Sequence, residues 1–261
     1  MKEYLLEIIF QYREAFAPDN DPLGTLKLYE VERPYPQLLR RTAYPANPRA
    51  HEALENHIDE LMKLGFFRKV GYSKEVGVTT TVITTWNNDK SRTVGDLSSL
   101  STYTIPDRYP FPRIHETLIQ LSKARFIASM DFLKGFHKNF STPDSRKLFR
   151  IISHCGIYEY LSIPFGIKNA PSNYQRMMNT IFPHELSEVC LIIYIDAIII
   201  CSEPSKLHLE RFSLVLKTLI QVNMKISLKK CNFGFHELNA LGKAFSGLSL
   251  GVDKKKWLQS Y

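Results

Sequence analysis

The apolar run from Leu191 to Cys201, whose one charged residue is Asp196, limits the possible folds of this chain more than any other segment. The run is too short to span a bilayer as a helix, and a charge at its middle would be costly there. Its isoleucines favour buried strands, because β-branched side chains pack well on a pleated sheet. We therefore expect two strands and a tight turn with Asp196 at its tip. A carboxylate fixed there is a natural cation ligand, and a plain turn-forming aspartate is the alternative.

The rest of the chain shows a mixture of helical and extended patterns. Apolar spacing predicts helices over residues 2–16, 48–64, 114–121, 169–182 and 206–222. Strands are predicted over residues 76–86, 92–96, 125–130, 156–163 and 224–228. We expect Asn169 to act as the N-cap of its helix, with Pro171 in the first turn. The pattern predicts an α+β fold, in which a mixed antiparallel sheet is backed by helices.

Composition narrows the choice of partners and compartment. The formal net charge of +8 favours polyanionic partners such as nucleic acid, and a solvated basic surface is the alternative. The four cysteines have neither CxxC nor zinc-type spacing, which indicates reduced thiols. No basic segment followed by a long apolar stretch begins the chain, so no secretory signal is predicted. We expect an intracellular protein of the cytoplasm or nucleus that is not secreted and has no membrane partner.

A second carboxylate, Asp131, ends the predicted strand over residues 125–130. If that strand lies beside the hairpin, Asp131 and Asp196 would stand at the same edge of the sheet. Mg²⁺ prefers carboxylate oxygens together with substrate phosphates. Two carboxylates at neighbouring strand ends are therefore suited to holding a pair of Mg²⁺ ions for phosphoryl transfer.

Four segments, in this order, resemble one known family. They are Thr104–Ile114, Ser129–His137, Pro164–Ser172 and Tyr194–Ala197. The family is the reverse transcriptase domain of gypsy-type LTR retrotransposons. The first segment is similar to the family's Thr-x-x-Asp-x-Tyr-Pro-x-Pro-x-Ile segment, and the second to the segment with its first catalytic Asp. The third is similar to its Pro-Phe-Gly-Leu-x-Asn-Ala-Pro signature, and the fourth to its Tyr-x-Asp-Asp motif. One such motif is a weak indication, whereas four in the right order are specific. The resemblance covers nearly the whole chain.

The resemblance implies a right-hand polymerase with fingers and palm and a thumb that is largely missing. The expected division is an extended leader over 1–47, fingers over 48–110 and 140–165, palm over 111–139 and 166–250, and a truncated start of the thumb or connection over 251–261. The implied activity is RNA-directed DNA polymerisation. Its implied partners are an RNA or DNA template with a primer, and deoxynucleoside triphosphates.

The resemblance also implies roles for individual residues. Asp131 and Asp196 would be the catalytic ligands of Mg²⁺ or Mn²⁺. Phe136 would exclude the 2′-hydroxyl of a ribonucleotide, with an ordinary core aromatic as the alternative. Arg92 would grip the incoming triphosphate through its planar fork of donors. Lys90 would assist as a point charge, with a solvated surface lysine as the alternative.

At the primer end, the resemblance points to Gly242 and Lys243, and a plain structural turn is the alternative there. Lys243 stands where the family usually has His. Ser98 and Ser101 stand where the family has Arg and Asn, which removes a cation and an amide from the expected template contact.

The most consequential departure from the family is Ala197, which occupies the position of the third metal-binding carboxylate. A methyl group cannot bind Mg²⁺, and metal stabilisation is worth several kcal/mol, so we expect a loss of rate of at least ~10³-fold. The sequence therefore predicts a catalytically impaired copy of a reverse transcriptase domain. The alternatives are a non-enzymatic nucleic-acid-binding remnant and a pseudogene product that folds poorly.

Overall fold

The structure is a computed structural model, and it describes most of the chain. The described residues are 2–16, 27–29, 42–43, 47–71, 79–80, 82–87, 90–112, 119, 121, 124–133, 135–182, 191–194, 197–235, 237–240, 243–246 and 249–252. They form two compact units: unit 1 comprises Met1–Asp21, Pro110–Leu133 and Gln175–Tyr261, and unit 2 comprises Pro22–Tyr109 and Lys134–Tyr174. The division into leader, fingers, palm and thumb stays a prediction.

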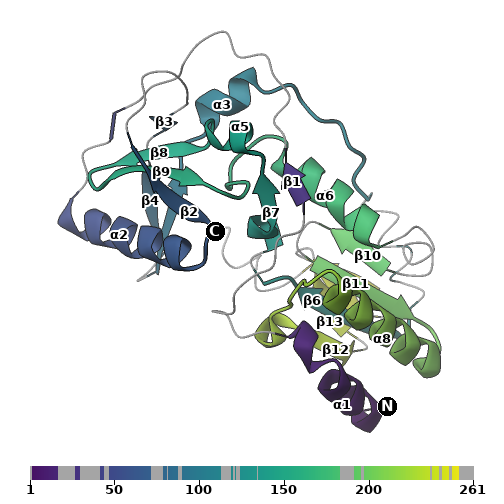
Figure 1. Ribbon diagram of the computed structural model, residues 1–261. Coiled ribbons are helices and arrows are strands. Elements are labelled where there is room, and N and C mark those ends of the chain that lie inside the picture. The colour runs from purple at the N-terminus through teal and green to yellow at the C-terminus, as the bar shows by residue number, and fades with distance from the viewer. Residues whose placement is uncertain are drawn as a thin grey trace. The chain divides into compact units, whose positions relative to one another are not determined.

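Unit 1 is built on a four-stranded antiparallel sheet in the order β10-β11-β6-β12 (Figure 1). The strands are β10 (Leu191–Tyr194), β11 (Ala197–Ser202), β6 (Phe126–Asp131) and β12 (Asn232–Phe235). β10 and β11 pair from Tyr194↔Ala197 outward, which confirms the predicted hairpin. Ile198, Ile199 and Ile200 are buried, as expected of β-branched residues in a central strand.

Helices cover this sheet. α8 (Ser205–Gln221) packs on β11 through the buried side chains Phe212, Val215, Leu216 and Leu219. α1 (Lys2–Gln11) contacts α8, and a short 3₁₀ helix, η1 (Arg13–Ala15), follows it. The single helix predicted over residues 2–16 is thus two helices. None of the described helices combines the length and the apolar character that crossing a bilayer requires.

The strand predicted over residues 224–228 is wrong. The segment forms only isolated bridges, from Ile226 to Phe16 and to Phe132, and the 3₁₀ helix η3 (Leu228–Lys230) begins where the strand should end. Met224, Ile226 and also Ser227 are buried. The alternating apolar residues therefore reflect burial between two neighbouring segments, without a ladder of hydrogen bonds.

The last described part of unit 1 is a separate three-stranded antiparallel sheet in the order β13-β14-β15. Its strands are β13 (Glu237–Ala240), β14 (Lys243–Ser246) and β15 (Ser249–Val252). This sheet contains Lys243, one of the two residues predicted at the primer end.

Unit 2 contains a second four-stranded sheet in the order β2-β9-β8-β3 and a separate two-stranded hairpin. The sheet comprises β2 (Phe67–Val70), β9 (Gly156–Tyr160), β8 (Arg150–Ser153) and β3 (Thr79–Thr80), and the hairpin β4 (Val82–Asn87) and β5 (Lys90–Gly95). A short parallel pair joins β1 (Lys27–Tyr29) to β7 (Asn139–Ser141). The short helical elements of unit 2 include α3 (Ser98–Tyr103), η2 (Gly135–Lys138) and α5 (Pro143–Arg146).

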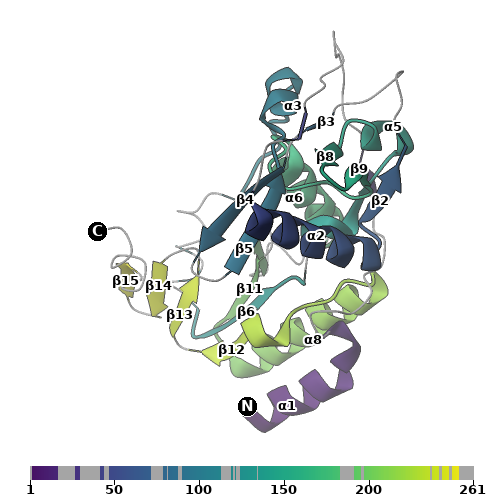
Figure 2. The same cartoon turned by 90° about the vertical axis from the view of Figure 1, so that its left-hand side faces the viewer.

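Helix α2 (Pro48–Lys63) follows the prediction closely. The Asn47 side chain caps it by accepting a hydrogen bond from the Ala50 N–H at 2.8 Å, and Pro48 opens the first turn. Gly65, with φ of 73°, follows the C-cap, where glycine adopts the left-handed conformation without strain. The buried face of α2 consists of Leu54, Ile58 and Leu61 and belongs to the core of unit 2. The helix contacts β2, β4 and β5 (Figure 2).

Helix α6 (Ala170–Ile181) begins where it was predicted and ends one residue earlier. The backbone carbonyl of Asn169 accepts the Asn173 N–H at 3.0 Å, as an N-cap carbonyl does. Its side chain, however, does not cap the helix: its amide bonds backbone groups of Asp107 and Ile105. Asn169 thus stands at the predicted N-cap position, and its side chain binds the proline-rich segment instead of the helix. The helix predicted over residues 114–121 falls mainly outside the described residues.

Three charged residues form one row across the sheet of unit 2. Arg68 on β2 and Arg150 on β8 are both register partners of Glu159 on β9. Arg68 donates to one oxygen of the buried carboxylate from Nε (3.0 Å) and Nη2 (2.7 Å), and Arg150 Nε donates to the other oxygen at 2.9 Å. One carboxylate thus holds three strands together.

Helix α8 carries a buried histidine in unit 1. His208 has no exposed surface, and its Nδ1 lies 2.7 Å from Ser202 Oγ. Arg211, one turn later, donates from Nη1 to the carbonyl of Cys201 at 2.8 Å. Burial lowers the pKa of His208 to about 4, and the nearby positive charge of Arg211 adds to this effect.

We predict that Glu159→Ala destabilises the protein by roughly 3 kcal/mol, because it removes the carboxylate that two guanidinium groups share. Arg68→Ala should cost only about 1 kcal/mol, because the Arg68 side chain is 54% exposed and Arg150 still neutralises Glu159. Urea unfolding of the two variants measures both losses. An Arg68→Ala loss as large as that of Glu159→Ala would contradict the central role of the carboxylate.

We also predict an acid-sensitive stability that depends on His208. Its folded-state pKa of about 4 lies below the ordinary value of 6.5, so protons bind the unfolded chain more readily. The free energy of unfolding that neutral His208 contributes is therefore complete above pH 6.5 and is lost as the pH falls toward 4. By pH 5 the loss should reach about 2 kcal/mol. Urea unfolding at pH 7.5 and 5 should show a smaller pH effect in His208→Gln than in the unaltered protein. The control His51→Gln should keep the full effect.

Candidate active site

Asp131 is the predicted catalytic residue that the structure places most completely. It ends strand β6, is half-buried, and pairs across the ladder with Ala197, the first residue of β11. The predicted neighbourhood of the two strands is thereby confirmed. Asp196 itself lies outside the described residues.

The backbone of Asp131 is also held from the side opposite β11. Its carbonyl accepts the Ser227 N–H at 3.1 Å, and the next bond of this kind joins the Leu133 N–H to the Lys225 carbonyl at 3.0 Å. Phe132 and Ile226 form the antiparallel bridge between them. The backbone that carries the carboxylate is thus fixed between β11 and this segment.

A thiol lies near this carboxylate. Cys231 donates to the carbonyl of Ser227 at 3.1 Å. Burial raises the pKa of Cys231 to about 12; a hydrogen bond with the backbone of Asp131 lowers this pKa, and the negative charge of Asp131 raises it. The thiol therefore stays protonated at neutral pH and supplies no negative charge to the site.

The donor set determines how well a divalent cation fits here. The resemblance implies three carboxylate positions, and the described residues include two of them. One is occupied by Asp131, and the other, directly across the ladder, by Ala197, whose side chain is a methyl group. Mg²⁺ requires oxygen ligands and does not accept a methyl group in their place. The residues at this edge thus fit a metal site with one ligand position lost.

The residues predicted to contact the nucleotide lie on two elements of unit 2. Lys90 and Arg92 are on strand β5, where they pair with Asn87 and Thr85. Phe136 is in η2, which begins four residues after the end of β6. The structure describes their backbones, and their side chains lie outside what it describes.

Strand β5 and helix η2 border the same cavity. It has a volume of about 160 Å³ and is lined by Ser91, Thr93 and Val94 of β5, His137 of η2, and His57, Leu61, Tyr160 and Phe165. The ring of His137 stacks on Phe66 with 4.7 Å between the ring centroids and meets Phe165 edge-on at 5.1 Å. The structure therefore brings together the elements that carry Arg92 and Phe136.

The predicted primer-end residues are placed only in part. Gly242 lies outside the described residues. The backbone of Lys243 opens strand β14 and pairs with Ala240 and Val252. A strand position beside a tight connection agrees equally with the alternative of a structural turn.

Two of the resembling segments are bound to each other in unit 2. Asn169 accepts the Asp107 N–H on Oδ1 at 3.0 Å and donates from Nδ2 to the Ile105 carbonyl at 2.6 Å. Ser172 donates from Oγ to the Asp107 carbonyl at 3.2 Å. The proline-rich segment is thereby held against the first turn of α6. Sequence reasoning did not find this contact, because no local pattern indicates that an amide at a helix start binds a segment more than 60 residues away.

The two serines that depart from the family pattern are used inside unit 2. The backbone N–H of Ser98 bonds Asp96 Oδ1 at 3.2 Å, and its hydroxyl donates to the same oxygen. Ser101 donates from Oγ to the Gly166 carbonyl at 3.3 Å. Ser98 lacks the positive charge that the family places there, and each hydroxyl has an internal acceptor.

Comparison with known proteins places the chain in a family. The sequence model of the family described as "Reverse transcriptase (RNA-dependent DNA polymerase)" matches residues 82–245. The Retrovirus-related Pol polyprotein from transposon 297 of Drosophila melanogaster is 35% identical over 222 residues, which cover 84% of this chain and 21% of the relative. The corresponding polyprotein from transposon gypsy of the same species is 29% identical over 273 residues, covering 100% of this chain and 26% of the relative. The chain thus spans about a fifth to a quarter of these relatives.

Solved structures share the fold. A foamy viral protease-reverse transcriptase in complex with an RNA/DNA hybrid superposes with a TM-score of 0.86 at 19% identity, covering 99% of this chain and 35% of that chain. A second foamy viral structure, in complex with double-stranded DNA, has the same TM-score and identity and covers 100% of this chain and 46% of that chain. At this identity the likeness establishes the fold. The match of the family model and the 35% identity to the transposon 297 polyprotein show that this chain belongs to the reverse transcriptase (RNA-dependent DNA polymerase) family, in which the relatives named above are retrovirus-related Pol polyproteins of transposons.

Proposed function

We propose that this chain is the fingers-and-palm part of a retrotransposon Pol polyprotein, and that its template-directed DNA synthesis is impaired in this copy. The observation that carries the proposal is the pairing of Ala197 with Asp131 across β11 and β6. The fingers would comprise residues 48–110 and 140–165, and the palm residues 111–139 and 166–250. Template, primer and deoxynucleoside triphosphates would be the substrates, and the complexes of the foamy viral structures with nucleic acid support the first two.

Each proposed site residue has a defined task. Asp131 and Asp196 would hold Mg²⁺ or Mn²⁺, which when bound lowers the pKa of the primer 3′-hydroxyl and neutralises charge on the phosphoryl group. Arg92 would orient the triphosphate through its planar fork of donors, assisted by the charge of Lys90. Phe136 would exclude a 2′-hydroxyl by its bulk, and Gly242 with Lys243 would contact the primer end.

The geometry of the ladder supports the proposed impairment. Ala197 is the residue directly opposite Asp131, and its side chain offers neither a ligand atom nor a charge. The nearby Cys231 thiol is protonated at neutral pH, because burial raises its pKa to about 12. We therefore expect metal binding at this edge to be weakened and the transferring phosphoryl group to be less well neutralised.

We predict that Ala197→Asp raises the rate of primer extension on an RNA template by about 10³-fold or more with Mg²⁺. The added carboxylate restores a metal ligand opposite Asp131. Single-nucleotide extension should be measured with Mg²⁺ and with Mn²⁺ for the unaltered chain and the variant, and Asp131→Ala serves as the blank. Ala197→Asn is the matched control, since it adds similar bulk without the charge.

Each outcome of this experiment decides something. Extension by the unaltered chain well above the blank would show that two carboxylates suffice and that impairment is wrong. Extension by Ala197→Asp alone would locate the defect in one side chain. If no variant extends a primer, the proposal that Ala197 causes the impairment fails, and the second function proposed below gains support.

The same observation supports a second function, non-enzymatic binding of nucleic acid. The net charge of +8 remains when metal binding is weakened, and electrostatic binding of phosphates does not require a metal. A chain of this kind would occupy primer–template without extending it.

We predict that the unaltered chain binds a labelled RNA/DNA primer–template in the absence of divalent metal, and that its affinity falls about 10²-fold or more between 50 and 200 mM salt. Fluorescence anisotropy at several salt concentrations gives the slope of log affinity against log salt. Asp131→Ala should bind as tightly as the unaltered chain. An affinity that does not change with salt, or an absence of binding at 50 mM, would contradict the binding function.

A further inference from the structure

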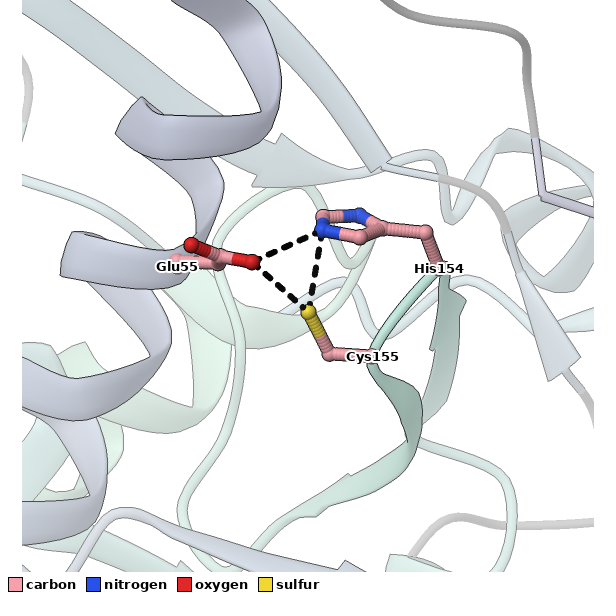
Figure 3. Close-up of side chains that lie close together, drawn as sticks. All are labelled: Glu55, His154 and Cys155. Carbon is pink, nitrogen blue, oxygen red and sulfur yellow. Dashed lines mark hydrogen bonds and ion pairs between the residues drawn. The ribbon is translucent and has the colours of Figure 1, made fainter. Parts of the chain in front are cut away.

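Three potential metal ligands from distant parts of the chain meet on unit 2 (Figure 3). His154 Nε2 lies 3.0 Å from Glu55 Oε1, Cys155 Sγ lies 3.3 Å from the same oxygen, and Cys155 Sγ lies 3.0 Å from His154 Nε2. Glu55 is about 100 residues from the other two in the sequence. The three atoms form a triangle with one oxygen, one nitrogen and one sulfur, separate from the predicted site at Asp131, which belongs to unit 1.

The local structure fixes two of these side chains at a hairpin tip. His154 and Cys155 are the two residues of the turn between β8 and β9, which closes at the Ser153↔Gly156 pair. Ser153 Oγ accepts the Cys155 N–H at 3.2 Å and donates to the Gly156 carbonyl at 3.3 Å. Gly156 has φ of +130°, a conformation that residues with a side chain rarely adopt. The turn therefore presents the imidazole and the thiol next to each other.

The third ligand comes from helix α2, which also orients the imidazole. His51 and Glu55 are four residues apart and hence lie on the same face of α2. The ring of His51 stacks on His154 at 4.0 Å between centroids, with 19° between the planes. Because the in-plane lone pairs of two nearly parallel rings do not converge, His51 positions the His154 ring and is not itself a ligand.

The dimensions of the triangle match a transition-metal ion. A tetrahedral Zn²⁺ with ordinary bond lengths separates nitrogen, oxygen and sulfur ligands by ~3.4–3.6 Å. The observed distances of 3.0 to 3.3 Å are those of mutual hydrogen bonds and need to expand by only a few tenths of an ångström. Glu55 is exposed and His154 is partly exposed, so small side-chain rotations provide this expansion.

The chemistry of the ligands selects the type of ion. Thiolate and imidazole suit Zn²⁺, whereas Mg²⁺ prefers oxygen ligands alone. We propose that Glu55, His154 and Cys155 bind one Zn²⁺ ion, with a water molecule in the fourth position, and that this ion cross-links α2 to the β8–β9 turn. Such a cross-link joins segments about 100 residues apart, so it restricts the unfolded chain and stabilises unit 2.

A catalytic or redox thiol is the competing interpretation of Cys155. Burial, together with the hydrogen bond to Glu55, raises the pKa of the Cys155 thiol. A reactive cysteine requires the opposite shift. Zn²⁺ binding would have to displace the same thiol proton.

The test uses the full chain, stripped of metal with a chelator, and Co²⁺ as a spectroscopic probe that Zn²⁺ then displaces. The expected signal is a thiolate-to-cobalt charge-transfer band together with the intense visible bands of tetrahedral cobalt. One equivalent of Zn²⁺ should abolish both, with a Kd of about 1 µM or below. Cys155→Ser should remove the charge-transfer band, and Glu55→Gln and His154→Gln should each weaken Zn²⁺ binding at least ~10-fold.

Matched controls separate this site from the rest of the protein. Cys231→Ser removes another half-buried thiol, and Glu52→Gln changes a carboxylate one turn earlier on α2; both should keep the full cobalt spectrum. Zn²⁺ should also raise the urea midpoint of the unaltered chain and leave that of Cys155→Ser unchanged. Should Cys155→Ser not fold, Glu55→Gln gives the same comparison from the helix side.

Three results would overturn the proposal. The first is the absence of a charge-transfer band in the unaltered chain. The second is a band that persists in Cys155→Ser or disappears in Cys231→Ser. The third is a Zn²⁺ affinity that Glu55→Gln and His154→Gln leave unchanged. None of these results bears on primer extension, which depends on the edge of the other sheet.

Discussion

The structure of unit 1 depends above all on the antiparallel ladder between β6 and β11. Six residue pairs, from Asp131↔Ala197 to Phe126↔Ser202, join the two strands, and the isoleucines of β11 are buried beneath α8. Residues 198–202 are all buried, so β11 is packed on both faces. A slip by one residue would exchange the side chains of the two faces, and close packing on both sides resists this exchange. The residue opposite Asp131 is thus set by packing over the whole strand. Because the ladder does not shift to bring another side chain to that position, a single substitution there is enough to alter the chemistry at this edge while the sheet stays intact.

Fold and chemistry are therefore separable in this chain. The fold agrees closely with polymerases whose sequences are only 19% identical, because burial patterns and strand pairing survive many substitutions. The proposed chemistry depends on a few side chains at the ends of strands, and at one of these ends Ala197 lies opposite Asp131. The departures at Ser98 and Ser101 show the same separation, since both hydroxyls donate to acceptors inside unit 2.

Periodicity and turn chemistry predicted the parts of the structure that depend on neighbours in sequence. These include α2 with its cap and terminal glycine, α8, the hairpin before Cys201, and the proximity of Asp131 to that hairpin. Prediction failed where burial arises from distant segments. Alternating residues around Ile226 gave a strand, although they only pack between Phe16 and Phe132. The shared carboxylate of Glu159, the backbone contacts of Asn169 and the triangle at Glu55 each join residues that no spacing rule connects, because their partners come from other elements.

The contacts of Asn169 and Ser172 with Ile105 and Asp107 also bear on the order in which unit 2 assembles. Each closes a loop of 62 to 65 residues, whereas the β8–β9 hairpin closes over only a few. Closing the long loops costs conformational entropy before the favourable contacts have formed, so we expect these bonds to form late in folding. Beside them, Ile167 and Ala170 are buried in the core of unit 2. The proline-rich segment and the first turn of α6 are therefore joined late, and apolar burial next to the polar bonds then holds them together.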